Sequence, residues 1–313
     1  MKLLYISFIL ILIASCTAKN KQVEIKVLPN YPSASAIEYF NDHFYIIGDD
    51  AKSILILDKD LNIKDSIQLY DAKEYRIPKP TKPDLESLTV LYTANGYRLL
   101  TLGSGSLKPY RNVGWMIDPE TKQANNFRLD SLYDRLTSSL GIREINIEGV
   151  CALQAGILLV SRGHLAYPEN NLLFIDSSWY FNLDNAVARK IKLEKAAIDT
   201  SSIFNGVSGL SYSTKTDRLF LTLSTELTTS TFGDGTIGKS YLWIINNFSK
   251  KLDLEKVAPD KIIALEKIDP GFKNQKIESV CIISERKNEM QLAMVADNDD
   301  GSSTVFKLRI DVD

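Results

Sequence analysis

The sequence predicts an all-β protein, a five-bladed β-propeller whose blades are four-stranded antiparallel sheets. Two observations lead to this prediction. Short strand-like segments recur in the same order five times along the 313 residues, and the fifth repeat lacks its last strand. A spare strand precedes the first repeat, as in a propeller that closes its ring with the N-terminal strand.

The first residues do not belong to the repeats. The stretch MKLLYISFILILIASC contains one lysine, an apolar run at residues 3–12 and small residues before Cys16. Such a run is too short to span a membrane and is typical of a secretory signal. Its end resembles a bacterial lipobox, which implies a signal peptide over residues 1–15, lipidation of Cys16 and a tether over residues 16–22. A plain cleaved signal or an uncleaved anchor is the alternative.

We therefore expect an exported protein that lipid chains hold on a membrane of the bacterial cell envelope. The rest of the chain, residues 23–313, is expected to form one propeller domain.

The strands follow one another in a fixed order within each repeat, separated by turns rich in Asn, Asp and Gly. First strands are expected at residues 35–40, 86–91, 148–153, 208–213 and 278–283. Second strands are expected at residues 43–50, 97–104, 156–163, 217–224 and 290–297. Third strands are expected at residues 53–58, 113–118, 172–176, 241–245 and 304–310. More polar fourth strands are expected at residues 63–69, 125–130, 188–193 and 260–267.

The spare strand VEIKVL, residues 23–28, supplies the fourth strand of the last blade and removes an exposed sheet edge. A six-bladed ring is the alternative, because a further blade could lie within the long insertions. Short helices are expected at residues 131–140 and 252–260.

Composition narrows the function classes. The net charge of −2 gives no basic field of the kind that nucleic-acid binding requires, so we expect no nucleic-acid partner. Cys151 and Cys281 occupy equivalent places in two separate repeats, which favours core residues over a disulfide. The nucleophile elbow Gly-x-Ser-x-Gly is absent, and His164 is the one plausible base of a serine triad.

Five oxygen-bearing side chains share one position in the repeat, where the first strand of each blade begins along the central channel. They are Ser35, Glu86, Glu148, Ser208 and Glu278. Three carboxylates crowded around one axis would repel one another, and a bound cation would relieve that repulsion. Ca²⁺ takes oxygen ligands in flexible geometry, whereas Zn²⁺ prefers His and Cys. In the alternative interpretation the glutamates bond to backbone amides of neighbouring blades and serve only closure of the ring.

Alternation along the strand after Glu278 is expected to turn Val280 toward the channel and Cys281 into the blade.

The order Ser-Glu-Glu-Ser-Glu, one residue per blade, resembles the calcium-activated nucleotidases (apyrases). This resemblance implies a five-bladed propeller with one Ca²⁺ held in the channel by those side chains. The segment SAIEYFNDHFYIIGDDAKSILILD, residues 35–58, is similar to the first blade of that family and includes the paired Asp49 and Asp50. The chain also resembles phytase-like esterase propellers and bacterial lipoproteins of unassigned function. It departs from the nucleotidases at LFLTLSTELTTS, residues 219–230, which lacks their arginine-rich motif and so weighs against phosphate handling.

Two functions follow from these patterns. In the first, the protein is a Ca²⁺-dependent phosphoanhydride or phosphoester hydrolase, with Asp50 or Asp49 as the catalytic base. In the second, it is a non-enzymatic binding module with a structural metal. In either case Arg111, Arg143 and Arg162, in long loops over the channel, are candidates to hold a small anionic ligand. A solvated surface of scattered ion pairs is the alternative for these arginines.

Overall fold

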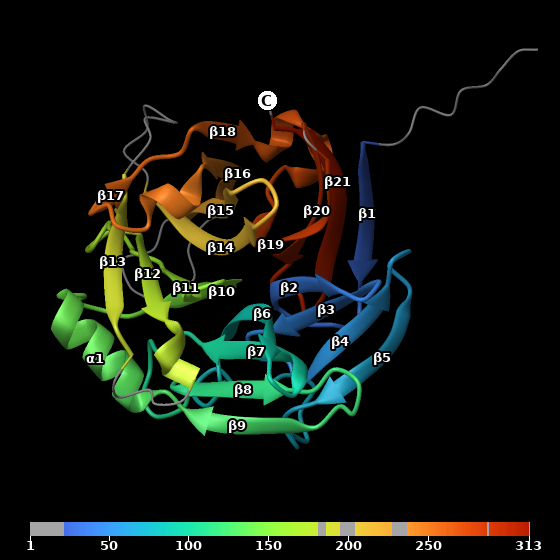
Figure 1. Cartoon of the computed structure of the whole chain (residues 1–313). Helices are drawn as coiled ribbons and strands as arrows, with labels where there is room; N and C mark the ends of the chain where they lie inside the picture. The colour runs from blue at the N-terminus through green and yellow to red at the C-terminus, as the bar shows by residue number, and fades with distance from the viewer. Residues whose placement is uncertain (1–21, 181–185, 195–203, 227–236, 287, 313) are drawn as a thin grey trace, which may run out of the picture.

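Five antiparallel sheets are arranged as blades around a central axis in the computed structural model (Figure 1). The structure describes residues 22–180, 186–194, 204–226, 237–286 and 288–312. Blade one contains β2 (Ala34–Phe40), β3 (His43–Gly48), β4 (Ser53–Asp58) and β5 (Ile63–Gln68). Blade two contains β6 (Leu85–Thr93), β7 (Gly96–Gly103), β8 (Val113–Ile117) and β9 (Ala124–Arg128). Blade three contains β10 (Ile147–Leu153), β11 (Gly156–Ser161), β12 (Asn171–Asp176) and β13 (Ala188–Leu193). Blade four contains β14 (Asn205–Ser213), β15 (Arg218–Glu226), β16 (Ile237–Asn246) and β18 (Lys261–Ala264).

Blade five joins the two ends of the described chain. It contains β19 (Lys276–Glu285), β20 (Glu289–Asp297), β21 (Ser303–Asp311) and, as its outer strand, β1 (Val23–Leu28). β1 runs antiparallel to β21, with Val23 opposite Leu308 and Leu28 opposite Ser303. This pairing confirms the predicted closure and gives a ring of five blades, not six.

The hydrophobic core lies between the blades. Five clusters of buried apolar side chains each join two neighbouring blades around the ring. Val280 belongs to the cluster between blades four and five, whereas Cys281 belongs to the cluster between blades five and one. The prediction that Val280 lines the channel is therefore wrong. A propeller blade turns its two sheet faces toward its neighbours and only the edge of its inner strand toward the axis, so alternating side chains fill the two interfaces.

Cys151 and Cys281 are buried free thiols in different clusters, as expected for core residues. The first predicted helix is confirmed as α1 (Asp130–Leu140), which ends at Gly141 in the left-handed conformation. No helix among the described residues is long and apolar enough to span a membrane.

The second predicted helix, at residues 252–260, is wrong. A 3₁₀ turn covers Phe248–Lys251, and the short strand β17 (Lys256–Val257) pairs in parallel with β13. The edge of blade three offers unpaired backbone groups, and this segment satisfies them: Lys192 N–H donates to Glu255 O at 2.9 Å and Glu194 N–H donates to Val257 O at 2.8 Å.

The two ends of the ring differ. We call the end with the turns between first and second strands the turn face, and the opposite end, with the connections from one blade to the next, the loop face. Each inner strand begins at the loop face, and each one carries a β-bulge there, directly after its first paired residues. A bulge re-aims the side chain that it adds to the strand.

Candidate functional site at the loop-face end of the channel

The bulge falls at the same position in all five inner strands. The residues that the bulge leaves without a partner across the ladder are Ser35, Glu86, Glu148, Ser208 and Glu278. These are the five residues that the repeat predicts at one equivalent position. The structure thus gives their equivalence a physical cause, a shared irregularity that turns one side chain out of the interblade alternation.

The two serines use their hydroxyl groups to join neighbouring blades. Ser35 Oγ donates to Leu85 O in blade two at 2.5 Å, and Ser208 Oγ donates to Ile277 O in blade five at 2.6 Å. Each bond links the inner strand of one blade to the inner strand of another. At these two positions the hydroxyl groups therefore help to close the ring.

Polar residues flank the bulges on both sides. The residues two positions before each bulge residue, at or just before the start of the inner strand, are Ser33, Asp84, Asn146, Gly206 and Lys276. Opposite them, where the second strand ends, lie Asp49, Ser104, Arg162, Ser224 and Asp297. Blade one and blade two therefore bring acidic residues to the same end of the channel from two different chain segments.

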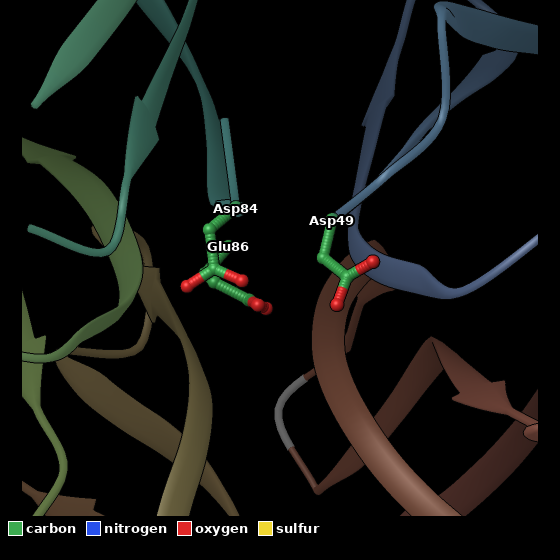
Figure 2. Close-up of side chains that lie close together, drawn as sticks. All are labelled: Asp49, Asp84 and Glu86. Carbon is green, nitrogen blue, oxygen red and sulfur yellow. The ribbon is translucent and has the colours of Figure 1, made fainter. Parts of the chain in front are cut away.

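Three of these carboxylates form a tight cluster (Figure 2). Asp49, Asp84 and Glu86 each offer an oxygen that lies within 4.8 Å of the others. Asp84 has a left-handed backbone with a φ of 53°, a conformation that Asp tolerates better than most residues. Asp49 Oδ1 is buried and has no hydrogen-bond partner among the described residues. A buried acceptor without a donor costs about 1–3 kcal/mol.

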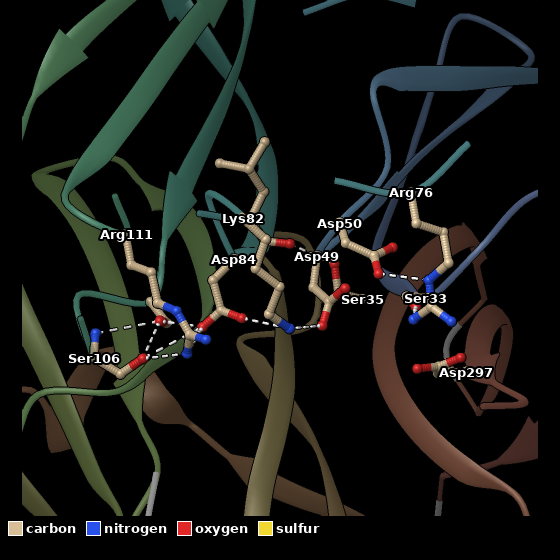
Figure 3. A network of polar contacts seen from close by, with 12 residues as sticks. Ser33, Ser35, Asp49, Asp50, Arg76, Lys82, Asp84, Ser106, Arg111 and Asp297 are labelled. Atoms are coloured by element: carbon tan, nitrogen blue, oxygen red, sulfur yellow. Dashed lines mark hydrogen bonds and ion pairs between the residues drawn. The ribbon is translucent and has the colours of Figure 1, made fainter. Parts of the chain in front are cut away.

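A lysine lies inside the same cluster (Figure 3). Lys82 forms ion pairs with Asp49 and with Asp84, the latter with Nζ 2.8 Å from Oδ1. Arg111 approaches the other side of Asp84, with Nη1 2.8 Å from Oδ2. Burial opposes the charge on Lys82, but Asp49 and Asp84 outweigh it and raise the pKa of the ammonium group. The cluster therefore holds an internal cation that neutralises part of its charge.

Three further acids at this end of the channel, Asp50, Glu148 and Glu278, have basic partners of their own. Arg76 Nε donates to Asp50 Oδ2 at 2.6 Å. Arg162 Nη1 lies 3.6 Å from Glu148 Oε2, and Lys276 Nζ lies 2.9 Å from Glu278 Oε1.

Several carboxyl groups at this end of the channel have raised pKa values. Burial, followed by the charges of Asp84 and Asp50, raises the pKa of Asp49 to about 6 against the opposing effect of Lys82. Burial and the charges of Asp84 and Glu148 raise the pKa of Glu86 well above its usual value. In both shifts, burial and the neighbouring carboxylates together outweigh the opposing effect of Lys82.

The same holds on the far side of the channel. Burial raises the pKa of Glu148 to about 7, reinforced by the charge of Glu278 and opposed by Arg162. Burial raises the pKa of Asp297 to about 7, again with the charge of Glu278 contributing. The carboxyl groups of blades one, two, three and five therefore interact as one electrostatic unit.

A charge balance over this unit leaves an excess of negative groups. The acidic members are Asp49, Asp50, Asp84, Glu86, Glu148, Glu278 and Asp297. The basic members are Arg76, Lys82, Arg111, Arg162 and Lys276. With every group ionised, the acids exceed the bases by two charges, which is the charge of one divalent cation.

The arginines predicted to hold a ligand divide into two groups. Arg111 is 2% exposed and bonds to Asp84 and to Ser106, so it supports the acidic cluster from behind. Arg143 and Arg162 line a separate cavity beside blade three.

Sequence reasoning missed two members of the site, Lys82 and Asp84. Both lie in the segment 73–84, which reads as a connection rich in lysine and proline. The sequence pattern could have indicated Asp84, because it stands two residues before Glu86, as Lys276 stands two residues before Glu278 in blade five.

His164 is not free to act as a base. Its Nε2 lies 3.0 Å from Glu144 Oε2, and its Nδ1 accepts from the N–H of Ala166 at 3.3 Å. Since Nδ1 is an acceptor, the proton of the neutral ring is on Nε2 and is donated to Glu144. Both nitrogens are thus engaged in holding the loop.

Comparison with known proteins gives a family. A family model matches residues 30–310, and its description is a family of unknown function (DUF6929). No curated protein matches the chain. Among solved structures, the chain is similar to a glutaminyl cyclase from Myxococcus xanthus at 11% identity and a TM-score of 0.49, covering 93% of this chain and 97% of that one.

Two further solved structures are similar over most of the chain. Virginiamycin B lyase from Staphylococcus aureus has 9% identity and a TM-score of 0.36, with 91% of this chain and 99% of that one covered. The β-propeller domain of Cps50 (Swd1) from Myceliophteria thermophila has 12% identity and a TM-score of 0.37, with 87% and 66% covered, slightly under two thirds of that chain. All three TM-scores are below 0.5, so these similarities carry no conclusion about function.

Proposed function

The chain belongs to the family of unknown function DUF6929, and we propose that it is a calcium-binding β-propeller of the bacterial cell envelope that presents a ligand-binding loop face. The observation that carries the metal proposal is the cluster of Asp49, Asp84 and Glu86, whose oxygens lie within 4.8 Å of one another.

The donor set suits a hard cation. The clustered ligands are carboxylate oxygens, which Ca²⁺ prefers, and neither histidine nor cysteine is among them. Asp49 Oδ1 is a buried acceptor without a donor among the described residues, and the acids of the surrounding unit exceed its bases by two charges when every group is ionised. Asp49, Asp84 and Glu86 would hold the ion, and Glu148 and Glu278 would contribute charge from across the channel. Bound Ca²⁺ would supply positive charge to a desolvated acidic site.

The proposed site differs from one built of carboxylates alone, because it also contains the ammonium group of Lys82. Its ammonium group already pairs with two of the three proposed ligands. Calcium and the ammonium group therefore compete for the same oxygens, and the affinity for Ca²⁺ is reduced by the free energy needed to separate those pairs. A buried pair of this kind costs about 3–5 kcal/mol when one partner is removed and the other charge stays.

The metal test compares melting temperatures of the full chain after chelation and after addition of millimolar Ca²⁺. Ligand at 100 times its dissociation constant stabilises the folded state by about 2.7 kcal/mol, so we expect the melting temperature to rise by several degrees. Glu86→Gln and Asp49→Asn should remove most of this rise. Lys82→Met should increase the Ca²⁺ affinity measured by calorimetry, because it removes the competing ammonium group.

Glu120→Gln is the matched control, since it removes one exposed carboxylate in a turn-face loop and should keep the full rise. Two results together would exclude the metal: elemental analysis without stoichiometric calcium, and a melting temperature that neither chelator nor Ca²⁺ changes. The ion pairs of Lys82 would then be the permanent means of neutralising the cluster.

We propose a binding module in preference to a hydrolase. Asp50, the candidate base, is 5% exposed, and its Oδ2 already accepts a charge-assisted hydrogen bond from Arg76. His164, the other candidate, has both ring nitrogens engaged. Nucleotide di- and triphosphates and phytate should therefore remain intact with Ca²⁺ present. Hydrolysis that Asp50→Asn abolishes, with the melting temperature unchanged, would establish the hydrolase instead.

The envelope location rests on the lipobox-like sequence that ends at Cys16, which lies outside the described residues. The proposed anchor fits the course of β1, which begins at the turn face and ends at the loop face. A tether before Val23 would hold the turn face toward the membrane and leave the acidic site and the loop face exposed to the surrounding compartment.

A further inference from the structure

A cavity lies beside the channel on the loop face, at blade three. Its volume is about 360 Å³. The segment after α1, the connection from β11 to β12 and β13 form its walls, and the residues that matter here are Arg143, Arg162, His164, Tyr167, Asn171 and Lys190.

The walls are held in place by contacts that need no ligand. Gly141 ends α1 with a φ of 63° and directs the chain over the cavity. The guanidinium group of Arg143 lies 5.0 Å from the centre of the Tyr167 ring. Tyr167 and His164 exchange backbone hydrogen bonds of 2.9 and 3.1 Å, which close the loop between them. A cavity that is already formed loses little conformational entropy when a ligand binds.

Asn171, one of the residues that line the cavity, carries an acceptor without a donor among the described residues. Asn171 is 6% exposed, and its Oδ1 is buried without a hydrogen-bond partner among the described residues. Its Nδ2 reaches only the carbonyl of Glu169, at 3.5 Å. A hydroxyl or amino group in the cavity would satisfy the orphaned oxygen and recover a cost of about 1–3 kcal/mol.

The rim is positively charged. Arg143 and Lys190 form no ion pair within 4.0 Å in the part of the chain that the structure describes. The two acids that line the cavity are already occupied: Glu169 pairs with Lys192 at 2.6 Å, and Glu144 accepts from His164. The hydrogen bond from Lys192, with the charges of Lys190 and Arg143, lowers the pKa of Glu169. Two cations therefore remain for an incoming anion.

We infer that this cavity binds a small organic anion that also carries a hydroxyl or amino group. The anionic group would lie between Arg143 and Lys190, and the donor would reach Asn171 Oδ1. Neither contact involves the carboxylates proposed to hold calcium, so this inference stands or falls independently of the metal.

The test measures binding to the full chain by calorimetry and by NMR titration with five probes. Lactate and glycerol 3-phosphate combine an anion with a hydroxyl group, whereas acetate and sulfate carry charge alone and glycerol carries hydroxyl groups alone. We expect the two combined probes to bind at least tenfold more tightly than the other three, because only they satisfy both ends of the cavity. The two combined probes also separate a carboxylate from a phosphate preference.

Two variants locate the binding. Lys190→Gln and Arg143→Gln should each weaken binding of the combined probes about tenfold, whereas Arg189→Gln should leave it unchanged. Arg189 is the neighbouring residue on β13 and pairs with Asp253 away from the cavity. Glu86→Gln should also leave probe binding unchanged, which separates this site from the calcium site.

Two outcomes would overturn the inference. One is that neither combined probe binds below about 10 mM. The other is that Arg189→Gln weakens binding as much as Lys190→Gln does, since binding would then depend on net charge and not on this cavity. Melting temperatures of the variants show that each is folded, and Lys190, which is only partly buried, is the substitution that least disturbs packing.

Discussion

Glu38 is a titratable group at the opposite end of the channel from the acidic cluster. It lies three residues after the bulge of blade one and lines a turn-face cavity of about 280 Å³ together with Thr89, Cys151 and Ser211. Burial raises its pKa from 4.5 to about 7, and the N–H of Tyr39, which donates to Oε1 at 3.0 Å, opposes the shift. The carboxyl group is therefore protonated in the folded state at pH values where the unfolded chain has released the proton.

This shift predicts a pH dependence of stability with a definite sign. Below pH 4.5 the group is protonated in both states and contributes nothing. Between pH 4.5 and 7 folding takes up a proton, so the contribution lowers stability progressively as pH rises, and the full cost is present above pH 7. Glu38→Gln should raise the free energy of unfolding by about 2 kcal/mol at pH 8 and have little effect at pH 4.

The measurement is urea unfolding of both proteins at the two pH values. Gln keeps an oxygen that can accept from Tyr39, so the variant changes the charge and little else. Glu120→Gln should show no such pH-dependent difference. A gain from Glu38→Gln that is equal at both pH values would contradict the raised pKa.

At the scale of the elements, the inner strands combine a bulge with a small residue. Directly after the bulge stand Ala36, Ser87, Gly149, Gly209 and Ser279. Between blades four and five the nearest neighbours of the small residue are backbone atoms. A Cβ on Gly209 would lie 2.7 Å from Ser279 Cα and 2.8 Å from Glu278 O. Both atoms belong to the backbone of β19, which has no flexible end that could move away.

Gly209→Ala should therefore destabilise the ring by about 2 kcal/mol, because overpacking forces the two inner strands apart. The same displacement would shift Glu278 relative to the other ring residues. Thermal unfolding measures the first effect. Ser279→Ala, at the equivalent position of blade five, only removes an oxygen and should change stability by less than about 1 kcal/mol. Equal melting temperatures for Gly209→Ala and the parent protein would show that the strands are not this closely packed.

At the scale of the whole molecule, the direction of β1 sets the orientation of the proposed lipoprotein. Seven tether residues, 16–22, reach about 24 Å at full extension. The turn face would then lie close to the lipid surface, while the loop face points away from it. A ligand would reach the proposed calcium site and the blade-three cavity without passing between the protein and the membrane.

Labelling of single cysteines on membrane vesicles tests this orientation. Tyr110→Cys lies on the loop face and Asn95→Cys in a turn-face hairpin, and both native residues are exposed. A polymer-linked maleimide should modify the Tyr110→Cys variant several times faster than the Asn95→Cys variant while the protein is anchored. In the background of Cys16→Ala, which should release the protein from the membrane, the two rates should become similar. The buried Cys151 and Cys281 contribute no signal. A faster reaction at the turn face, or retention of the Cys16→Ala protein on membranes, would refute the arrangement.

The sequence by itself determined the architecture. Strands, turns and the equivalence of Ser35, Glu86, Glu148, Ser208 and Glu278 are local patterns that repeat five times, and repetition makes each weak signal testable against four others. Closure by residues 23–28 followed from counting strands. The short helix predicted at residues 252–260 failed because an exposed edge of blade three, distant in the sequence, offered that segment better backbone partners.

Only the tertiary structure decided which polar groups meet. Asp49, Lys82 and Asp84 come from two blades and a connecting segment, and no spacing in the sequence brings an internal ammonium group between two carboxylates. The alternating pattern around Val280 correctly predicted a strand. Its two faces, however, pack against the neighbouring blades, so Val280 lies in an interface between blades and not in the channel. The cavity of Arg143, Asn171 and Lys190 likewise arises where three segments of blade three meet. Contacts between segments depend on how sheets pack, and packing is a property of the assembled ring.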